Sequence, residues 1–386
     1  MKVEQIYSLM NTVTGEILGK ADIVKEDLSN VVDVGTEIFN QSSVDNYVKS
    51  LVNHIGKVIF VNRPYAGNAP SVLMDGWEFG SVLEKIQADI PEAVENQSWE
   101  LTDKQEYKQD IFYKPSVSAK FFNKRVTFEV AMSFTDRQVK ESFSSAEQLN
   151  GFLSMLYNSV EKSMSIKIDS LIMRTINNMI AETIKSDYAG SLTDLTQKSG
   201  VKAVNLLYLY NTKYTKTLTA EQAITDADFI RFASYTISLY KDRLSKISTL
   251  FNVGKKERFT AGEYLHTILL SDFVSACGVF LQSNTFNKEM VALPNAERVP
   301  YWQGSGTDYS FAKTSDINVT CASGEDIAVS GVIGVMFDRD SLGVSNLNRR
   351  VTTNYNAKAE FYNNYYKFDA GYFNDLNENF VVFFME

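Results

Sequence analysis

Residues 145–185 carry a continuous apolar stripe at helical spacing, and no proline interrupts the chain between Pro115 and Pro294. The stripe consists of Leu149, Phe152, Leu153, Leu156, Val160, Met164, Ile168, Leu171, Ile172, Ile176, Met179 and Ile180. Ser145 and Gln148 fit a capping box at its start. The pattern predicts a helical rod of about 60 Å at 1.5 Å per residue. Because the stripe is too wide for a strict heptad, we expect the helix to pack on a sheet or on other helices.

Residues 71–135 predict a long β-hairpin with an elaborated, acidic tip at about 87–116. The expected outgoing limb holds Val72, Met74, Trp77, Phe79 and Leu83. The return limb alternates more cleanly, with apolar residues at Phe122, Val126, Phe128, Val130, Met132 and Phe134. Seven carboxylates and three lysines lie within the tip segment.

The remaining chain mixes short helices and strands. Ser43 is a candidate N-cap for a helix over residues 44–55, within an arm formed by residues 1–60. The spacing predicts a helix over 228–244, a buried strand over 264–270 followed by a helix capped at Ser271, and a strand over 332–337. The aromatic tail, 351–386, alternates and ends in an apolar run at 380–384, which we expect to be a core strand without a flexible extension.

Composition excludes several classes of protein. Two cysteines and two histidines are too few for a disulfide framework, a cysteine-based zinc site or a histidine-rich metal centre. No apolar run near 18 residues predicts a transmembrane helix, and the N-terminus has no apolar signal-peptide core. The net charge of −9 and the lack of a Lys/Arg block disfavour direct binding of nucleic acid. A reducing cytoplasm is the simplest compartment for such a chain.

Few residues suggest chemistry, and each has a simpler structural interpretation. Asp338 and Asp340 form a DxD pair that could hold a divalent metal, but a turn after a strand is the favoured interpretation. His266 is expected to be a core residue, and Cys277 and Cys321 to be inert packing. We therefore expect no catalytic, metal or cofactor site.

The unusual feature is architectural. A two-stranded ribbon cannot bury its own apolar limbs well, and burying one large apolar side chain is worth roughly 1.5–3 kcal/mol. The natural cover is a neighbouring copy of the same chain. Because the arm and the hairpin each need such a cover, their contacts would be heterologous and would build rings and shells.

The order of these parts resembles that of tailed-phage major capsid proteins with the Hong Kong 97-type fold. The local amino-acid sequence resembles that of their phi-29-like podophage branch. The segments that carry the resemblance are Phe39-Asn40-Gln41, Asn46 to Gly56, Ala292-Leu293-Pro294-Asn295, Val299 to Gly304, Phe337 to Asp340, Arg349-Arg350-Val351 and Tyr362 to Tyr366. Together they span essentially the whole chain.

The resemblance implies an α+β fold with named parts. These would be an N-terminal arm at 1–60, an E-loop hairpin at 61–135, a P domain with the spine helix at 136–204, an A domain at 205–335, and return strands of the P domain at 336–386. It also implies a non-enzymatic protein without cofactors, whose copies form pentamers and hexamers of an icosahedral or prolate head around double-stranded DNA.

Partners and location are implied in the same way. The short arm implies a separate scaffolding protein, and a head implies a portal protein; neither a membrane nor sequence-specific DNA binding is implied. The protein would lie in the virion after assembly in the host cytoplasm. We expect no immunoglobulin-like module of the kind that some relatives carry, and Lys120 and Lys124 are no evidence for isopeptide cross-linking.

Six residues are the candidate inter-subunit contacts of the hairpin: Trp77, Phe79, Phe121, Phe122, Val126 and Phe128. Packing within the hairpin is the alternative role for each. On the first interpretation, Phe122→Asp would leave the helical core folded but prevent assembly. Two other functions stay open: a metal-dependent glycosyltransferase that uses Asp338 and Asp340, and a phage tail or surface-binding module.

Overall fold

The computed structural model describes part of the chain and divides it into two compact units. The described residues are Asn11 and 69–74, 83–88, 90–91, 93–95, 102–106, 110–135, 146–189, 194–282, 296–303, 310–321 and 324–386. The first unit comprises 1–78, 125–174 and 344–371, and the second comprises 79–124, 175–343 and 372–386. The helix expected at 44–55 and the contact residues Trp77 and Phe79 lie outside the described residues.

A single long helix, α5 (Ala146–Asp187), confirms the prediction made for residues 145–185. Its 42 residues span roughly 63 Å at 1.5 Å per residue. The apolar stripe is fully buried from Val160 to Ile180 at the positions described. The helix contributes 146–174 to the first unit and the remainder to the second.

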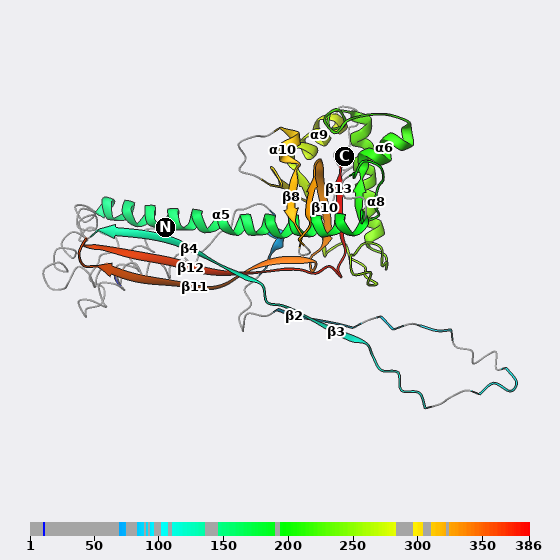
Figure 1. The fold of residues 1–386 in the computed structure, drawn as a ribbon, viewed down its shortest axis with the longest axis horizontal. Helices are drawn as coiled ribbons and strands as arrows, with labels where there is room; N and C mark the ends of the chain where they lie inside the picture. Colours follow the sequence, from blue (N-terminus) through cyan, green and yellow to red (C-terminus); the bar gives the residue numbers. More distant parts are fainter. Residues whose placement is uncertain are drawn as a thin grey trace. The chain divides into compact units, whose positions relative to one another are not determined.

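The first unit contains a four-stranded sheet in the order β1 (Leu73–Met74), β11 (Leu342–Asn356), β12 (Phe361–Asn374) and β4 (Arg125–Thr135). A short 3-10 turn, η1 (Pro70–Val72), precedes β1. Figure 1 shows the N-terminal part of α5 running alongside β4, β12 and β11. The sheet therefore gives the stripe of this part of the helix the apolar surface that its width predicts.

Strand β4 confirms the alternation read at 126–134 but not its expected partner. It pairs antiparallel with β12 in an unbroken register from Thr135↔Phe361 to Arg125↔Gly371. The rings of Phe128 and Phe368 lie 5.2 Å apart across this pair. The expected return limb thus leaves the hairpin after Phe122, because the aromatic-rich β12 offers it a longer and more apolar partner than the outgoing strand does.

The second unit is built on a five-stranded sheet in the order β5 (Ala203–Asn205), β13 (Phe380–Phe384), β10 (Val332–Asp338), β6 (Leu265–Leu270) and β7 (Ala296–Val299). Two of its three interior strands, β13 and β10, are buried at every position. Strands covered on both faces read as continuous apolar runs, which is how residues 332–337 and 380–384 appear in the sequence.

Helices α6 (Leu206–Tyr214), α8 (Ala227–Leu244) and α9 (Ser271–Gln282) supply the core of the second unit together with the sheet. Asp226 caps α8 by accepting a hydrogen bond from the Phe229 amide at 2.7 Å. The predictions for 228–244, 264–270 and the helix at Ser271 are confirmed. Smaller elements complete the unit: α7 (Ala220–Ala223), α10 (Phe311–Thr314), β8 (Ile317–Thr320) and β9 (Asp326–Val329).

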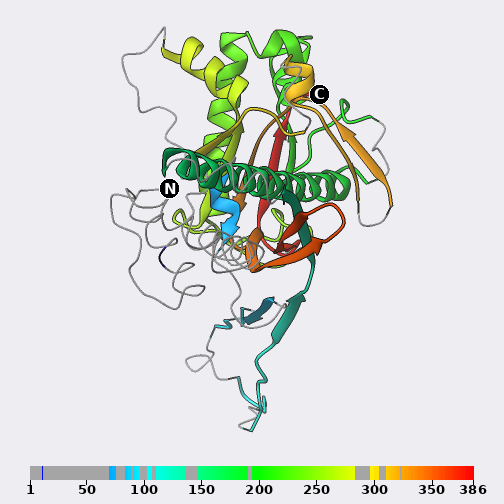
Figure 2. The same cartoon turned by 90° about the vertical axis from the view of Figure 1, so that its left-hand side faces the viewer.

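The aromatic tail divides between the units, whereas the resemblance implies one set of return strands over 336–386. Strands β11 and β12 belong to the sheet of the first unit, but β13 pairs antiparallel with β10 and parallel with β5 in the second (β13 is red in Figures 1 and 2). The expectation that 380–384 forms a core strand is confirmed, since all five residues are at most 1% exposed.

No helix among the described ranges combines the length and apolar character that spanning a membrane requires.

Gly331 stands at a close approach between two segments of the second unit. Its φ is +70°, and a Cβ built there would lie 2.1 Å from the carbonyl oxygen of Met385. Gly331→Ala is therefore expected to lower the free energy of unfolding by about 2 kcal/mol, through strain and displaced backbone. Chemical denaturation would measure the loss. Gly262→Ala is the control, because a Cβ at Gly262 meets nothing within 4 Å; equal effects from both changes would contradict the argument.

Candidate functional site: an anchored hairpin with an exposed apolar face

Strands β2 (Leu83–Ala88) and β3 (Val117–Phe122) form a two-stranded antiparallel ribbon within the second unit. Their register runs from Leu83↔Phe122 to Ala88↔Val117. The hairpin predicted by the sequence is therefore present at these residues. Every residue that the structure describes between 90 and 117 is exposed.

The two faces of this ribbon differ in burial because side chains alternate along a strand. The inner face is partly buried and holds Leu83, Lys85, Gln87, Ser118, Lys120 and Phe122. The outer face is exposed and holds Glu84, Ile86, Ala88, Val117, Ala119 and Phe121. Ile86, Val117 and Phe121 are each at least 60% exposed, so the outer face is largely apolar and open to solvent.

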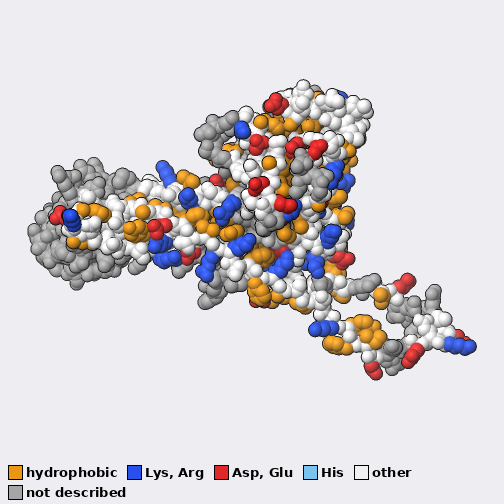
Figure 3. Space-filling view, viewed as in Figure 1, with side chains coloured by type: hydrophobic (Ala, Val, Ile, Leu, Met, Phe, Trp, Pro, Cys, Tyr) orange, Lys and Arg blue, Asp and Glu red, His pale blue; other side chains and the backbone are white. Residues whose placement is uncertain are grey.

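Apolar exposure continues into the tip (Figure 3). Val94, Phe112 and Tyr113 are more than 80% exposed, and Ile90 and Ile111 are close to half exposed. Contiguous exposed apolar surface on a folded protein marks an interaction site. A lone ribbon with two open edges also invites pairing with another chain.

The inner face of the ribbon is held by a cluster of charges that we call the anchor cluster: Lys85, Lys120, Arg258, Asp375 and Glu378. Lys85 and Lys120 lie directly opposite each other in the register. Like charges in that position repel. The Asp375 carboxylate relieves the repulsion, since Oδ2 accepts a hydrogen bond from Lys85 at 3.0 Å and Oδ1 accepts one from Lys120 at 2.7 Å.

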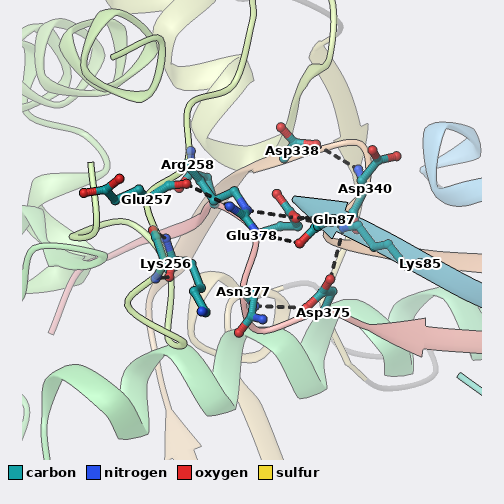
Figure 4. Close-up of polar contacts among 12 residues, drawn as sticks. Lys85, Gln87, Lys256, Glu257, Arg258, Asp338, Asp340, Asp375, Asn377 and Glu378 are labelled. Carbon is teal, nitrogen blue, oxygen red and sulfur yellow. Dashed lines mark hydrogen bonds and ion pairs between the residues drawn. The ribbon is translucent and has the colours of Figure 1, made fainter. Parts of the chain in front are cut away.

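Glu378 completes the anchor cluster three residues further on (Figure 4). Its Oε1 accepts hydrogen bonds from Lys85 at 2.8 Å and from Gln87, and lies 3.4 Å from Arg258 Nε. The guanidinium of Arg258 also donates to the Gln87 side chain at 2.5 Å. The side chain of Asp375 is wholly buried and that of Glu378 is 7% exposed. Both carboxylates come from the segment between β12 and β13, so that segment fixes both strands of the ribbon.

The pKa of Asp375 predicts how this attachment responds to pH. Burial alone would raise it, but the hydrogen bond from Lys120 and the charge of Lys85 bring it below its ordinary value of 3.8. The stability that Asp375 contributes is therefore complete above about pH 4 and is lost as the pH falls through the lower folded pKa.

We expect amide exchange in β2 and β3, corrected for its intrinsic pH dependence, to show weaker protection below pH 4 than at pH 6. In Asp375→Asn this change should be absent. Equal losses of protection in both proteins would contradict the assignment.

The DxD pair has the structural role favoured by the sequence. Asp338 follows the apolar part of β10, where its Oδ1 accepts from the Asp340 amide at 2.9 Å and its Oδ2 accepts from the Thr260 hydroxyl at 2.8 Å. Burial raises the pKa of Asp338, which disfavours the charged form that a metal ligand needs. Within the described residues no three His, Cys, Asp or Glu side chains gather as a metal site.

His266 and the two cysteines are likewise structural. His266 stacks on Phe337 with ring centroids 5.9 Å apart, and burial, followed by the nearby charge of Arg339, lowers its pKa. Burial raises the pKa of Cys277 and brings that of Cys321 to about 11, so both stay as thiols at neutral pH.

Of the predicted contact residues that the structure describes, Phe121 and Phe122 lie on opposite faces of the ribbon, whereas Val126 and Phe128 lie on β4 of the first unit. Phe121 lies on the outer face and is 64% exposed. Phe122 packs on Phe373 within its own unit at 5.1 Å, and Phe128 on Phe368, so these two have partners inside the chain. Val126 is half-buried on β4.

Sequence reasoning missed the anchor cluster. The available signal was the alternation itself, which places Lys85 and Lys120 on the same face as Leu83 and Phe122 and so calls for a buried carboxylate partner.

Comparison with known proteins connects this geometry to a family. The sequence profile of Phi29-like phage major capsid proteins matches residues 10–384. The major capsid protein of Bacillus phage B103 is 21% identical over 217 residues, which are 53% of this chain and 47% of that protein. The chain thus aligns with about half the length of this curated relative.

Solved structures resemble this chain in fold at low identity. The capsid structure of Staphylococcus phage Andhra is 10% identical with a TM-score of 0.49, over 84% of this chain and 86% of that one. A structure described as the head fiber and inner core protein gp22 of native bacteriophage P68 is 10% identical with a TM-score of 0.50, over 85% and 87%.

Proposed function

This chain belongs to the Phi29-like phage major capsid protein family, and we propose that many copies of it build the head of a tailed double-stranded DNA phage. Its mixed α+β architecture is the Hong Kong 97-type capsid fold, as the resemblance implied. The family is one of structural proteins and not of enzymes. In this role the protein is a component of the virion.

The observation that supports the proposal most directly is the hairpin. Its inner face is fixed by buried charges, whereas its outer face and tip expose large apolar side chains. A segment that is rigidly held and yet uncovered is built to be completed by a neighbour. Because the covering surface would be a different part of an identical chain, the contact is heterologous and can close into rings and shells.

The parts of the fold then take the roles that the resemblance implies. The hairpin within 61–135 acts as the E-loop, α5 as the spine of a P domain together with the β4–β12–β11 sheet, and the lobe at 205–335 as the A domain. On this assignment β13 extends the sheet of the A-domain lobe, although it lies in the tail segment.

The partners follow from assembly. The shell is made of pentamers and hexamers of this chain, directed by a separate scaffolding protein and joined to a portal protein. The packaged DNA is enclosed without sequence-specific binding. The net charge of −9 suits that role, because a weakly acidic wall limits adhesion of phosphates.

Negative-stain microscopy of the expressed chain, with and without a scaffolding protein, tests the proposal. Shells tens of nanometres wide are the expected result. A chain that stays monomeric even with a scaffolding protein would overturn it. Trimers without shells would favour a tail or surface-binding module, and manganese-dependent sugar transfer would favour a glycosyltransferase.

A further inference from the structure

A pocket between α6 and α8 gathers aromatic and cationic side chains on the second unit. It has a volume of about 600 Å³ and is lined by Tyr210, Lys213, Tyr214, Lys216, Asp228, Arg231, Phe232 and Tyr235. We call it the aromatic pocket. Its size is in the range of sites that hold a ligand or a few side chains.

Three rings of the aromatic pocket, those of Tyr210, Tyr214 and Phe232, form one packed group. The centroid of the Tyr210 ring lies 4.9 Å from that of Tyr214 and 5.5 Å from that of Phe232. Tyr214 and Tyr235 are nevertheless 49% and 60% exposed. The pocket therefore presents ring surface to solvent, although three of its rings are held in place by one another.

Its cations are placed by the backbone at the end of α6. Thr215 adopts a left-handed conformation with φ of 53°, which turns the chain so that the Lys216 amide donates to the Asn211 carbonyl at 2.9 Å. The Lys216 ammonium then lies 5.8 Å from the Tyr210 ring centroid, and that of Lys213 lies 5.2 Å from the Tyr214 ring centroid. These ammonium groups are fixed at the rim by the rings.

The pocket is positive within an acidic protein. Lys213, Lys216 and Arg231 give +3 and Asp228 gives −1, so the lining carries +2 in a chain of net charge −9. Arg231 pairs with Asp228 at 3.1 Å. Among the described residues neither lysine forms an ion pair with a carboxylate, so the two ammonium groups are available to an acidic ligand.

The hairpin tip offers the complementary chemistry. Over residues 89–114 the sequence holds seven carboxylates and three lysines, a net charge of −4. Asp110, Phe112 and Tyr113 lie within four consecutive residues of an exposed segment without regular structure. At about 3.3 Å per residue they span roughly 10 Å, which brings a carboxylate and two rings together on one short stretch.

We propose that the aromatic pocket receives the acidic, ring-bearing hairpin tip of a second copy of this chain. The inference rests on the proposed shell function and adds to it the receiving surface. Ring contacts and desolvated carboxylate–ammonium pairs would hold the tip. Nucleic acid, which also stacks and carries negative charge, fits less well, because a strand needs a positive groove that follows its backbone and this pocket contains Asp228.

Photo-cross-linking tests the contact directly. Full-length protein with 4-benzoylphenylalanine at position 113 is mixed with isotopically heavy protein, assembled and irradiated. The expected products join light to heavy copies at peptides from 206–216 and 227–235. Cross-links within one copy, cross-links at other peptides, or adducts with added single-stranded DNA in their place would each overturn the inference.

Charge exchange supplies the second measurement. Lys213→Glu with Lys216→Glu should reduce the cross-link yield about tenfold, as should Glu106→Lys with Asp110→Lys in the tip. Combining all four changes should restore the yield to within about twofold. The control pair, Lys246→Glu with Lys313→Glu, changes two exposed lysines outside the pocket and should leave the yield unchanged.

Microscopy of the same samples separates the two levels of the argument. Wild-type shells whose cross-links avoid the pocket overturn the inference but leave the shell function intact. Failure of the unmodified protein to form any shell with a scaffolding protein overturns the function and, with it, this contact. Failure of the fourfold charge exchange to restore the yield, in variants that melt like wild type, also overturns the pairing.

Discussion

Phe121→Lys should yield a subunit that folds normally and builds no shells. Phe121 is 64% exposed on the outer face of the hairpin, so its replacement removes little packing within the chain. Lysine is preferred to aspartate because the residue opposite in the register is Glu84, which a lysine can pair with and an aspartate would repel. We expect the free energy of unfolding to stay within about 0.5 kcal/mol of wild type.

The assembly defect should be large because the same contact recurs in every subunit pair. Losing a central aromatic anchor costs about 2 kcal/mol or more per contact, which is roughly 30-fold in affinity. Shell yield by sedimentation and microscopy is the measurement. Ile247→Lys, the same change at an apolar residue 58% exposed elsewhere in the unit, should assemble. Normal shells from Phe121→Lys would refute the role of the outer face.

Phe122→Asp is expected to act by a different cause from Phe121→Lys. The sequence predicts that it leaves the helical core folded and prevents assembly, and the structure adds that Phe122 packs on Phe373 within the same unit. We therefore expect it to loosen the hairpin base as well as to hinder assembly. Amide exchange over 117–122 distinguishes the two variants, since only Phe122→Asp should accelerate it.

Asp375→Asn should have the largest effect on stability. The wholly buried carboxylate binds two lysines that face each other across the ribbon. An amide can accept from one lysine, but its NH2 group would point at the other and leave a charge without compensation. We expect a loss of about 2–4 kcal/mol in the stability of the hairpin base, towards the lower end because Lys120 is 39% exposed.

Hydrogen exchange of 83–88 and 117–122 would measure this loss. Asp340→Asn is the matched control, because it makes the same change at a nearby exposed carboxylate. If both variants exchange at the same rate, the anchor cluster does not hold the hairpin. The Asp375→Asn protein should also assemble poorly, because a loosened hairpin no longer holds its apolar outer face in a fixed orientation toward a neighbouring copy.

Periodicity predicted the local elements well, because it records which face of an element is buried. The stripe of α5, the alternation of β4 and the continuous apolar runs of β10 and β13 were all readable. Pairing was less accessible. The alternation at 126–134 showed that a half-buried strand exists there, but it could not indicate that β12, more than 200 residues away, is the partner.

The site was only partly predictable for the same reason. Exposed apolar residues on a ribbon can be expected from the hairpin pattern, and Phe121 was among them. The anchor cluster joins Lys85 to Asp375 across 290 positions, and the aromatic pocket needs two helices to meet. Trp77 and Phe79 lie outside the described residues, so their contact role stays a prediction.

Strand β13 imposes an order on how the protein is made. Its neighbours β5 and β10 are synthesised earlier, yet they have no direct pairing with each other, and β13 fills the space between them. During translation β5 and β10 therefore each keep one edge unpaired until residues 380–384 have left the ribosome. The sheet of the lobe that carries the aromatic pocket can therefore be completed only after that point.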